Sequence, residues 1–133
     1  MKKIVVAFDS FKGSLSSVEA AEAFVLGVQE ICPDAECHVV ALSDGGEGIA
    51  EAVVYTLGGE MVAAEVHDPL YRVITANYGI IDSGATAVIS MASASGLMLL
   101  EPSERNPLIT TTYGVGELLI DAVRRGCREI IVG

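Results

Sequence analysis

A glycine-rich loop between an apolar run and a helix-like segment constrains the fold of this chain more than any other feature. Residues 43–48 read Ser-Asp-Gly-Gly-Glu-Gly and follow the apolar run at residues 39–42. Residues 49–57 then carry apolar side chains at helical spacing. Glycines let backbone N–H groups approach a ligand, and a helix N-terminus adds a partial positive charge. A strand, a glycine loop and a helix in this order indicate an anion site at the end of a strand.

Two carboxylates in this loop, Asp44 and Glu47, refine that expectation. They would repel an anion unless a divalent cation lay between, so the loop predicts Mg²⁺ together with a phosphorylated ligand. Which carboxylate binds the metal and which binds a substrate hydroxyl stays open. The alternative is a tight turn in which Glu47 interacts favourably with the dipole of the following helix.

The first forty residues predict a βαβ unit. Residues 4–8 are apolar at every position, which is typical of a strand covered on both faces in a parallel sheet. Ser16 and Glu19 have the spacing of a capping box at the start of a helix that Pro33 ends. Residues 36–42 form the second strand.

The hydrophobic period changes after the helix that follows the glycine loop. Residues 61–67 and 72–80 alternate apolar and polar side chains, which predicts an antiparallel hairpin and the entry to a second, lid-like domain. Residues 87–91 predict a further strand. A helix then begins after Thr112 and stops at Gly126, and a last strand leads to Gly133. A buried strand in final position predicts that this is the N-terminal part of a longer polypeptide.

Composition narrows the class of protein. The chain has 133 residues, about half of them hydrophobic, which suits a globular domain with a real core. No apolar run approaches the roughly 20 residues of a membrane span, so we expect a cytoplasmic protein. The net charge of −10 argues against nucleic acid or an anionic membrane as partner. Three cysteines without a CxxC pair indicate reduced thiols.

Four segments in this order resemble the glycerate kinase family, in its bacterial form that makes 2-phosphoglycerate. They are residues 9–14 (DSFKGS), 43–48 (SDGGEG), 91–97 (MASASGL) and 111–118 (TTYGVGEL). The resemblance covers the whole chain and implies further protein beyond Gly133. It implies an α/β fold in which a Rossmann-like parallel sheet carries an inserted second α/β domain containing the antiparallel hairpin. The expected division is residues 1–59 and 91–133 for the first domain and 60–90 for the inserted one.

The resemblance also implies the reaction, which is transfer of the γ-phosphoryl group of ATP, with Mg²⁺, to D-glycerate. Phosphoryl transfer needs mainly positioning and charge stabilisation, so its residues should be cations, metal ligands and backbone donors. We expect Lys12 to hold the glycerate carboxylate or a phosphate, and Asp9 to act as general base or metal ligand. The expected site residues are Asp9, Lys12 and Asp44 for catalysis, Ser10, Gly45, Gly46, Gly48, Ser93 and Ser95 for substrate or phosphate, and Asp44 and Glu47 for the metal.

Other polar residues have weaker claims. His38 and His67 are expected to be structural, and Thr111 or Thr112 to cap the helix that follows. Arg72 is either an anion contact or a surface charge. A dinucleotide-dependent oxidoreductase fits badly because no GxGxxG follows the first strand. A non-catalytic nucleotide- or anion-binding fragment remains the alternative.

Overall fold

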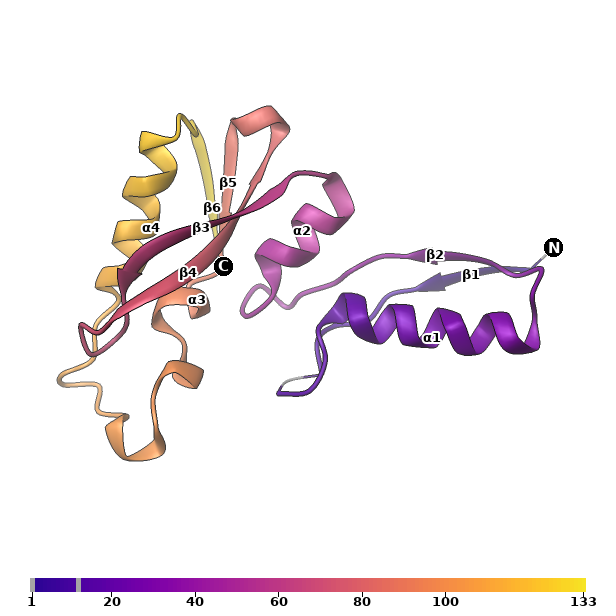
Figure 1. Ribbon diagram of the computed structural model, residues 1–133, viewed down its shortest axis with the longest axis horizontal. Coiled ribbons are helices and arrows are strands. Elements are labelled where there is room, and N and C mark those ends of the chain that lie inside the picture. Colours follow the sequence, from indigo (N-terminus) through magenta and orange to yellow (C-terminus); the bar gives the residue numbers. More distant parts are fainter. Residues whose placement is uncertain (1, 12) are drawn as a thin grey trace. The chain divides into compact units, whose positions relative to one another are not determined.

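The structure is a computed structural model that describes residues 2–11 and 13–133. The chain forms two compact units, one up to Asp44 and one from Gly45 onward. Figure 1 shows the elements of each unit, and each has its own sheet.

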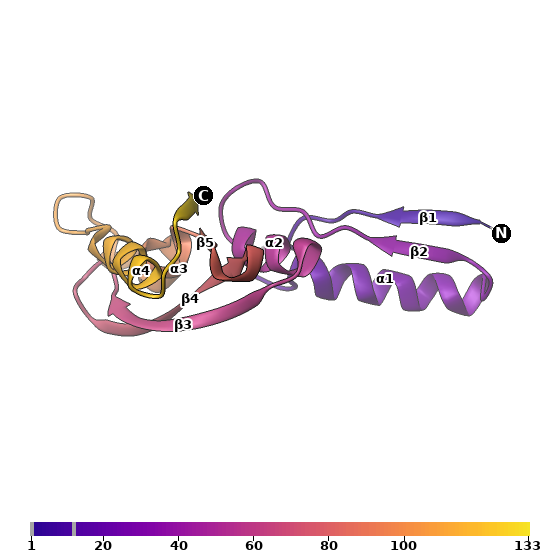
Figure 2. The ribbon, with the colours of Figure 1, turned by 90° about the horizontal axis from the view of Figure 1, so that it is seen from above.

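The first unit is the predicted βαβ unit. Strand β1 (Lys3–Val6) pairs in parallel with β2 (Glu36–Val39), and α1 (Ser17–Ile31) connects them along one face of the pair (Figure 2). Backbone hydrogen bonds continue past the strand ends, from Val40 N–H to the Val6 carbonyl (2.9 Å) and from Leu42 N–H to the Phe8 carbonyl (3.1 Å). The loops after β1 and β2 therefore open at the same edge of the pair.

The capping box predicted for α1 is confirmed. The Ser16 hydroxyl accepts from the Glu19 backbone N–H at 3.2 Å, and the Glu19 carboxylate accepts from the Ser16 backbone N–H at 2.8 Å. Hydrogen bonds from the backbone and side chain of Ser16 lower the pKa of Glu19. The expectation that β1 is covered on both faces is wrong for the described residues, because Val5 is 68% exposed. Helix α1 covers one face only.

The second unit is built on a mixed sheet. Its strands are β3 (Glu60–His67), β4 (Val73–Ile81), β5 (Thr86–Ile89) and β6 (Glu129–Val132), hydrogen-bonded in that order. The β3–β4 and β4–β5 pairs are antiparallel and the β5–β6 pair is parallel. The predicted hairpin is confirmed, and it shares one sheet with the two strands that follow. The predicted boundaries at residues 60 and 91 stay a prediction.

Helices cover both faces of this sheet. Helix α2 (Ile49–Leu57) packs Ala50 against Ile81 and Val88. Helix α4 (Tyr113–Arg124) packs on the other face, where the main core gathers Tyr78 and Ile89 with Leu118. The short α3 (Ala92–Ser95) and the 3₁₀ turns Asp82–Gly84, Leu97–Leu99 and Pro102–Glu104 complete the unit. Strand β5 is buried throughout, as its apolar sequence predicts.

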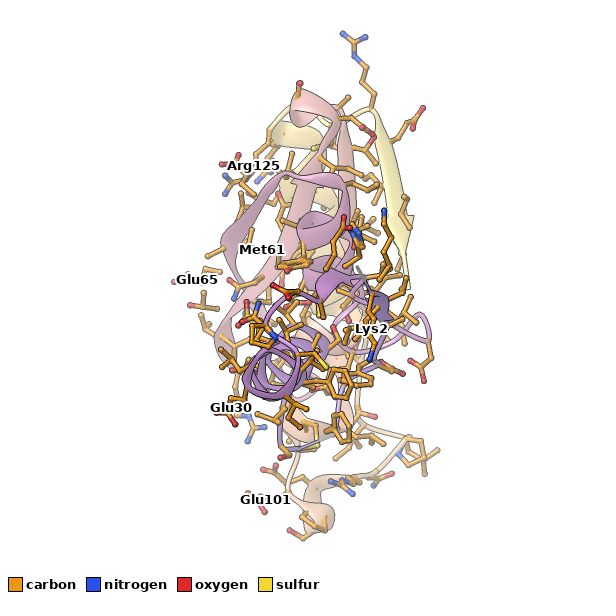
Figure 3. All side chains as sticks on the ribbon, turned by 90° about the vertical axis from the view of Figure 1, so that its right-hand side faces the viewer. Lys2, Glu30, Met61, Glu65, Glu101 and Arg125 are labelled. Carbon is orange, nitrogen blue, oxygen red and sulfur yellow. The ribbon has the colours of Figure 1, made fainter. Side chains whose placement is uncertain are left out.

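A polar cluster fixes the end of α4 to the sheet. The buried Tyr78 hydroxyl donates to Asp121 Oδ2 at 2.8 Å, and Arg125 Nε donates to the same oxygen at 2.7 Å. Arg125 also reaches the Ala63 carbonyl on β3 at 3.3 Å, and Figure 3 shows it on the same side of the unit as Glu65. Burial and Asp121 together raise the pKa of Tyr78. Asp121 and Arg125 are four positions apart on the chain, the spacing at which helical side chains form ion pairs.

Two further expectations concern membranes and thiols. Within the described ranges, no helix has the length and apolar character needed to cross a membrane. All three cysteines are free thiols, with Cys127 buried and Cys32 and Cys37 half-buried.

Candidate functional site

The first candidate loop follows β1 and carries Asp9 and Ser10. The Asp9 carboxylate accepts a hydrogen bond from the Ser10 backbone N–H at 2.7 Å, which is the local loop role that competes with a catalytic one. Ser10 Oγ is a buried atom that has no hydrogen-bond partner among the described residues. A buried hydroxyl of this kind suits a ligand contact. Lys12 lies outside the described residues.

The glycine loop leads directly into α2 in the second unit. Gly45 (φ 96°) and Gly48 (φ 85°) adopt the left-handed conformation that glycine tolerates best, and Gly48 is the N-cap residue of α2. No side-chain hydrogen bond caps this helix N-terminus among the described residues, and the Ile49 N–H donates to the Gly46 carbonyl at 3.3 Å. The carboxylates of the loop, Asp44 and Glu47, are exposed.

Three backbone segments meet at the loop. The Ser90 hydroxyl, at the end of β5, donates to the Gly46 carbonyl at 3.1 Å. Gly133, at the end of β6, lies so close to the loop that a Cβ there would sit 2.5 Å from the Gly45 carbonyl oxygen. The Met91 N–H donates to the Gly133 carbonyl at 2.7 Å. The loop therefore lies at the carboxyl ends of the parallel β5–β6 pair, where α/β sheets bind their ligands.

The serines of α3 are close to this junction. Ser93 Oγ donates to the Ser90 carbonyl at 2.7 Å, so it stabilises the turn in the present structure. Ser95 Oγ is a buried atom without a hydrogen-bond partner in the part of the chain that the structure describes. The structure thus brings Gly46 and Ser93 together, because Ser90 hydrogen-bonds to both. Ser90 is not among the residues predicted for the site. Ser90 follows an apolar strand and has no motif of its own, so only the fold reveals its contact.

A second polar group lies at the other end of the hairpin. Glu117, on the first turns of α4, accepts from the His67 backbone N–H at 2.7 Å and lies 3.0 Å from His67 Nδ1. The two residues are 50 positions apart, so no local spacing could have linked them. At the start of α4 the N-cap residue is Thr112, which makes no side-chain capping hydrogen bond among the described residues. The Thr111 hydroxyl, one residue earlier, accepts from the Tyr113 N–H at 3.1 Å.

Arg72 was left open between an anion contact and a surface charge, and the structure places it in an ion-pair network. Its guanidinium contacts Asp68 at 2.5 Å, Glu104 at 3.0 Å and the Leu99 carbonyl at 2.8 Å. Burial alone would raise the pKa of Asp68, but hydrogen bonds from Arg72 and Leu70 outweigh it and lower that pKa. His38 is half-exposed on β2 and contacts Glu36 at 2.9 Å.

The donor set for a metal is limited. No group of three or more His, Cys, Asp or Glu side chains among the described residues could hold an ion. Mg²⁺ commonly takes only one or two protein carboxylates, with water and substrate phosphates as its other ligands. The carboxylates of Asp44 and Glu47 are both exposed, and each is a hard oxygen donor of that kind, so either residue fits Mg²⁺ as a single protein ligand.

Taken together, the folded elements define an α/β protein with a glycine loop and a helix N-terminus at the carboxyl ends of parallel strands. The model of the glycerate kinase family matches residues 4–133. This chain belongs to the glycerate kinase family.

Named relatives agree with this membership. The chain is 46% identical over 131 residues to the glycerate 2-kinase of Escherichia coli, which covers 98% of this chain and 34% of that protein. It is 44% identical over 133 residues to a glycerate kinase of Halalkalibacterium halodurans, covering 100% and 35%. A crystal structure described as glycerate kinase 2 from Salmonella typhimurium LT2 matches with a TM-score of 0.81 and 45% identity, over 99% of this chain and 35% of that chain. The chain therefore spans about a third of the length of the curated relatives it matches.

Proposed function

We propose that this chain functions as a glycerate kinase. Such an enzyme transfers the γ-phosphoryl group of ATP to D-glycerate and gives 2-phosphoglycerate. The observation that carries the proposal is the family match over residues 4–133. The identity to a protein named glycerate 2-kinase supports the 2-hydroxyl as acceptor.

The glycine loop is proposed as the phosphate-binding element. Gly45, Gly46 and Gly48 leave room for close approach of a phosphate to backbone N–H groups, and the dipole of α2 favours its negative charge. Asp44 and Glu47 would hold Mg²⁺, which supplies neutralisation of phosphate charge when bound. Asp44 is assigned both to catalysis and to the metal because the loop puts it next to the phosphate-binding glycines.

The remaining assignments concern the acceptor. Asp9 would accept the proton of the glycerate hydroxyl, and Lys12 would hold a carboxylate or phosphate as a point charge. Ser10, Ser93 and Ser95 would hydrogen-bond glycerate or phosphate. Support is uneven, because Ser10 Oγ and Ser95 Oγ are buried atoms without a described partner, whereas Ser93 Oγ already donates to the Ser90 carbonyl.

A second candidate function is nucleotide or anion binding without turnover. The share of the curated relatives that the chain spans, about a third, favours it, because phosphoryl transfer needs donor and acceptor sites held together. The two candidates differ in one observable. A binding protein retains Mg-ATP without releasing ADP in response to D-glycerate.

The deciding experiment measures D-glycerate-dependent ADP release by the purified chain with Mg-ATP. The Lys12→Ala variant should lose at least about a hundredfold in turnover, the usual cost of removing a charge-stabilising group. Lys3→Ala is the matched control, since Lys3 is an exposed lysine that contacts Glu36 at 3.5 Å. Equal activity of both variants would contradict the role of Lys12. Binding of Mg-ATP without turnover by a folded chain would favour the second candidate.

Location and organisation are proposed on sequence grounds. A cytoplasmic protein with no nucleic-acid or membrane partner follows from the charge of −10 and the absence of a long apolar run. The division into residues 1–59 and 91–133, with 60–90 as part of an inserted domain, also stays a proposal.

A further inference from the structure

The contact between His67 and Glu117 defines the role of the other imidazole nitrogen, Nε2. A carboxylate only accepts hydrogen bonds, so Glu117, 3.0 Å from Nδ1, keeps the proton of the neutral ring on that atom. Nε2 is then a hydrogen-bond acceptor. The His67 side chain is 35% exposed, so a ligand can reach the ring.

Two tyrosine rings surround this imidazole. The ring centroid of His67 lies 6.1 Å from that of Tyr71 and 6.0 Å from that of Tyr113, and the two tyrosine centroids are 5.6 Å apart. Figure 1 shows the hairpin end beside the first turn of α4, from which these rings come. Both tyrosines are more than half exposed. His67, Tyr71 and Tyr113 form a ring cluster that offers aromatic surface and one acceptor atom.

Tyr71 occupies a backbone position that its side chain disfavours. Its φ is 62°, in the left-handed region where a bulky residue is an outlier. Glycine would form the same turn at lower conformational cost, so the turn does not require a ring there. Strained residues of this kind concentrate at ligand sites.

The support of the ring cluster is rigid. Asp68 is buried and accepts hydrogen bonds from the Leu70 N–H at 2.8 Å and the Arg72 N–H at 2.9 Å. Arg72 ties the same turn to Glu104 and to the Leu99 carbonyl. The backbone of the turn that carries Tyr71 is therefore held before any ligand arrives, which lowers the entropic cost of binding.

We propose that the ring cluster binds the purine base of the nucleotide donor and selects adenine over guanine. An uncharged planar base can stack on a tyrosine ring, and it is not repelled by Glu117 or Glu104. The 6-amino group of adenine donates to His67 Nε2, whereas the 6-oxo group of guanine would place an acceptor against an acceptor. The inference rests on the proposed function, because it takes the ligand to be the phosphoryl donor.

Adenosine and guanosine are the probes, since neither carries phosphate. The chain has only two histidines, so proton–nitrogen correlation spectra of the imidazoles resolve His67 with His38 as an internal control. Adenosine should shift the His67 signals and leave those of His38 unchanged. Guanosine should bind about tenfold more weakly, the discrimination expected of one lost donor–acceptor match.

Three variants separate recognition from structure. Tyr71→Gly suits the backbone and should fold, yet it should weaken adenosine binding about tenfold through lost stacking. Tyr55→Gly alters the tyrosine exposed on α2 and should leave binding unchanged. His67→Phe keeps a ring but removes Nε2, so adenosine and guanosine should then bind equally. A merely structural role of His67 would not equalise the two bases.

The outcomes keep this inference apart from the proposed function. Unmoved His67 signals with adenosine, while Mg-ATP binds in calorimetry, would overturn the inference and leave the kinase proposal standing. No binding of either probe or of Mg-ATP would overturn the inference as well. A shift of His67 by adenosine without any glycerate-dependent ADP release would support the inference and count against the kinase proposal.

Discussion

Two glycines of α4 provide a matched test of how this helix meets the sheet. A Cβ on Gly114 would collide with the His67 carbonyl oxygen, and it would lie 3.0 Å from the His67 carbonyl carbon and 3.3 Å from Ala94 Cβ. Gly116 lies two residues further along the same helix, and no described atom is within 4 Å of its Cβ position. Alanine at 114 therefore forces helix and strand apart, whereas alanine at 116 enters open space.

The expected magnitudes have opposite signs. Alanine is favoured over glycine inside a helix by about 1 kcal/mol, so Gly116→Ala should raise the free energy of unfolding by up to that amount. The same gain applies at Gly114, but the colliding oxygen belongs to the β3 backbone and cannot rotate away. Overpacking of this kind costs about 1–3 kcal/mol and occasionally more. With a collision against backbone, we place the steric cost at or above the upper end, so Gly114→Ala should lose about 2 kcal/mol or more.

Tyrosine fluorescence is the appropriate measurement. All four tyrosines lie in the second unit, and the chain has no tryptophan, so urea unfolding followed by this signal reports on that unit. The two variants should differ by about 3 kcal/mol. A difference below about 1 kcal/mol would refute the close contact between α4 and β3 at Gly114. The His67 imidazole signals should also move in Gly114→Ala, because the displaced helix carries Glu117.

Three further substitutions test single interactions. Asp68→Asn removes a carboxylate whose pKa is lowered below its ordinary value of 3.8. This carboxylate contributes stability that is present above pH 3.8 and is lost as the pH falls through the lowered pKa. The free energy of unfolding, measured in urea, should therefore fall less steeply with decreasing pH in the variant than in the parent below about pH 4. Tyr78→Phe deletes the 2.8 Å hydrogen bond to Asp121 and should cost about 1 kcal/mol in urea unfolding, and an unchanged midpoint would show that the bond adds no stability. Ser16→Ala removes the N-cap hydroxyl of α1 and should cost about 1 kcal/mol by far-UV circular dichroism, with no change in tyrosine fluorescence.

Local signals in the sequence predict most of the elements. The Ser16–Glu19 spacing marks the start of α1, and the C-cap of α2 is a glycine, Gly58, at φ 78°. The two-residue period predicts β3 and β4, because alternation records one covered face. The extent of cover on β1 was not predictable in this way, since apolar residues at every position identify a strand but not what packs against it.

In the candidate site, too, local features were predictable from the sequence and long-range contacts were not. The glycine loop was predictable because left-handed turns and close approaches require glycine at Gly45 and Gly48. Contacts between distant residues were not. The Ser90 hydroxyl contacts the Gly46 carbonyl although the two residues are 44 positions apart in the sequence, and neither residue type predicts this contact. This contact joins the end of β5 to the loop before α2, so it depends on how the second unit folds.

Positive φ angles at residues other than glycine mark positions where the backbone departs from what the side chain prefers. The structure has three among its described residues, Tyr71, Asp82 and Ser83. Asp82 and Ser83 lie in a tight turn, and short polar side chains of this kind bond locally there, with Asp the better suited to the left-handed region. Tyr71 lacks a short polar side chain that could stabilise this conformation, because its side chain is a bulky ring that is more than half exposed. A local preference broken at an exposed aromatic residue, beside an imidazole that lies 3.0 Å from a carboxylate, supports the proposal that the ring serves binding.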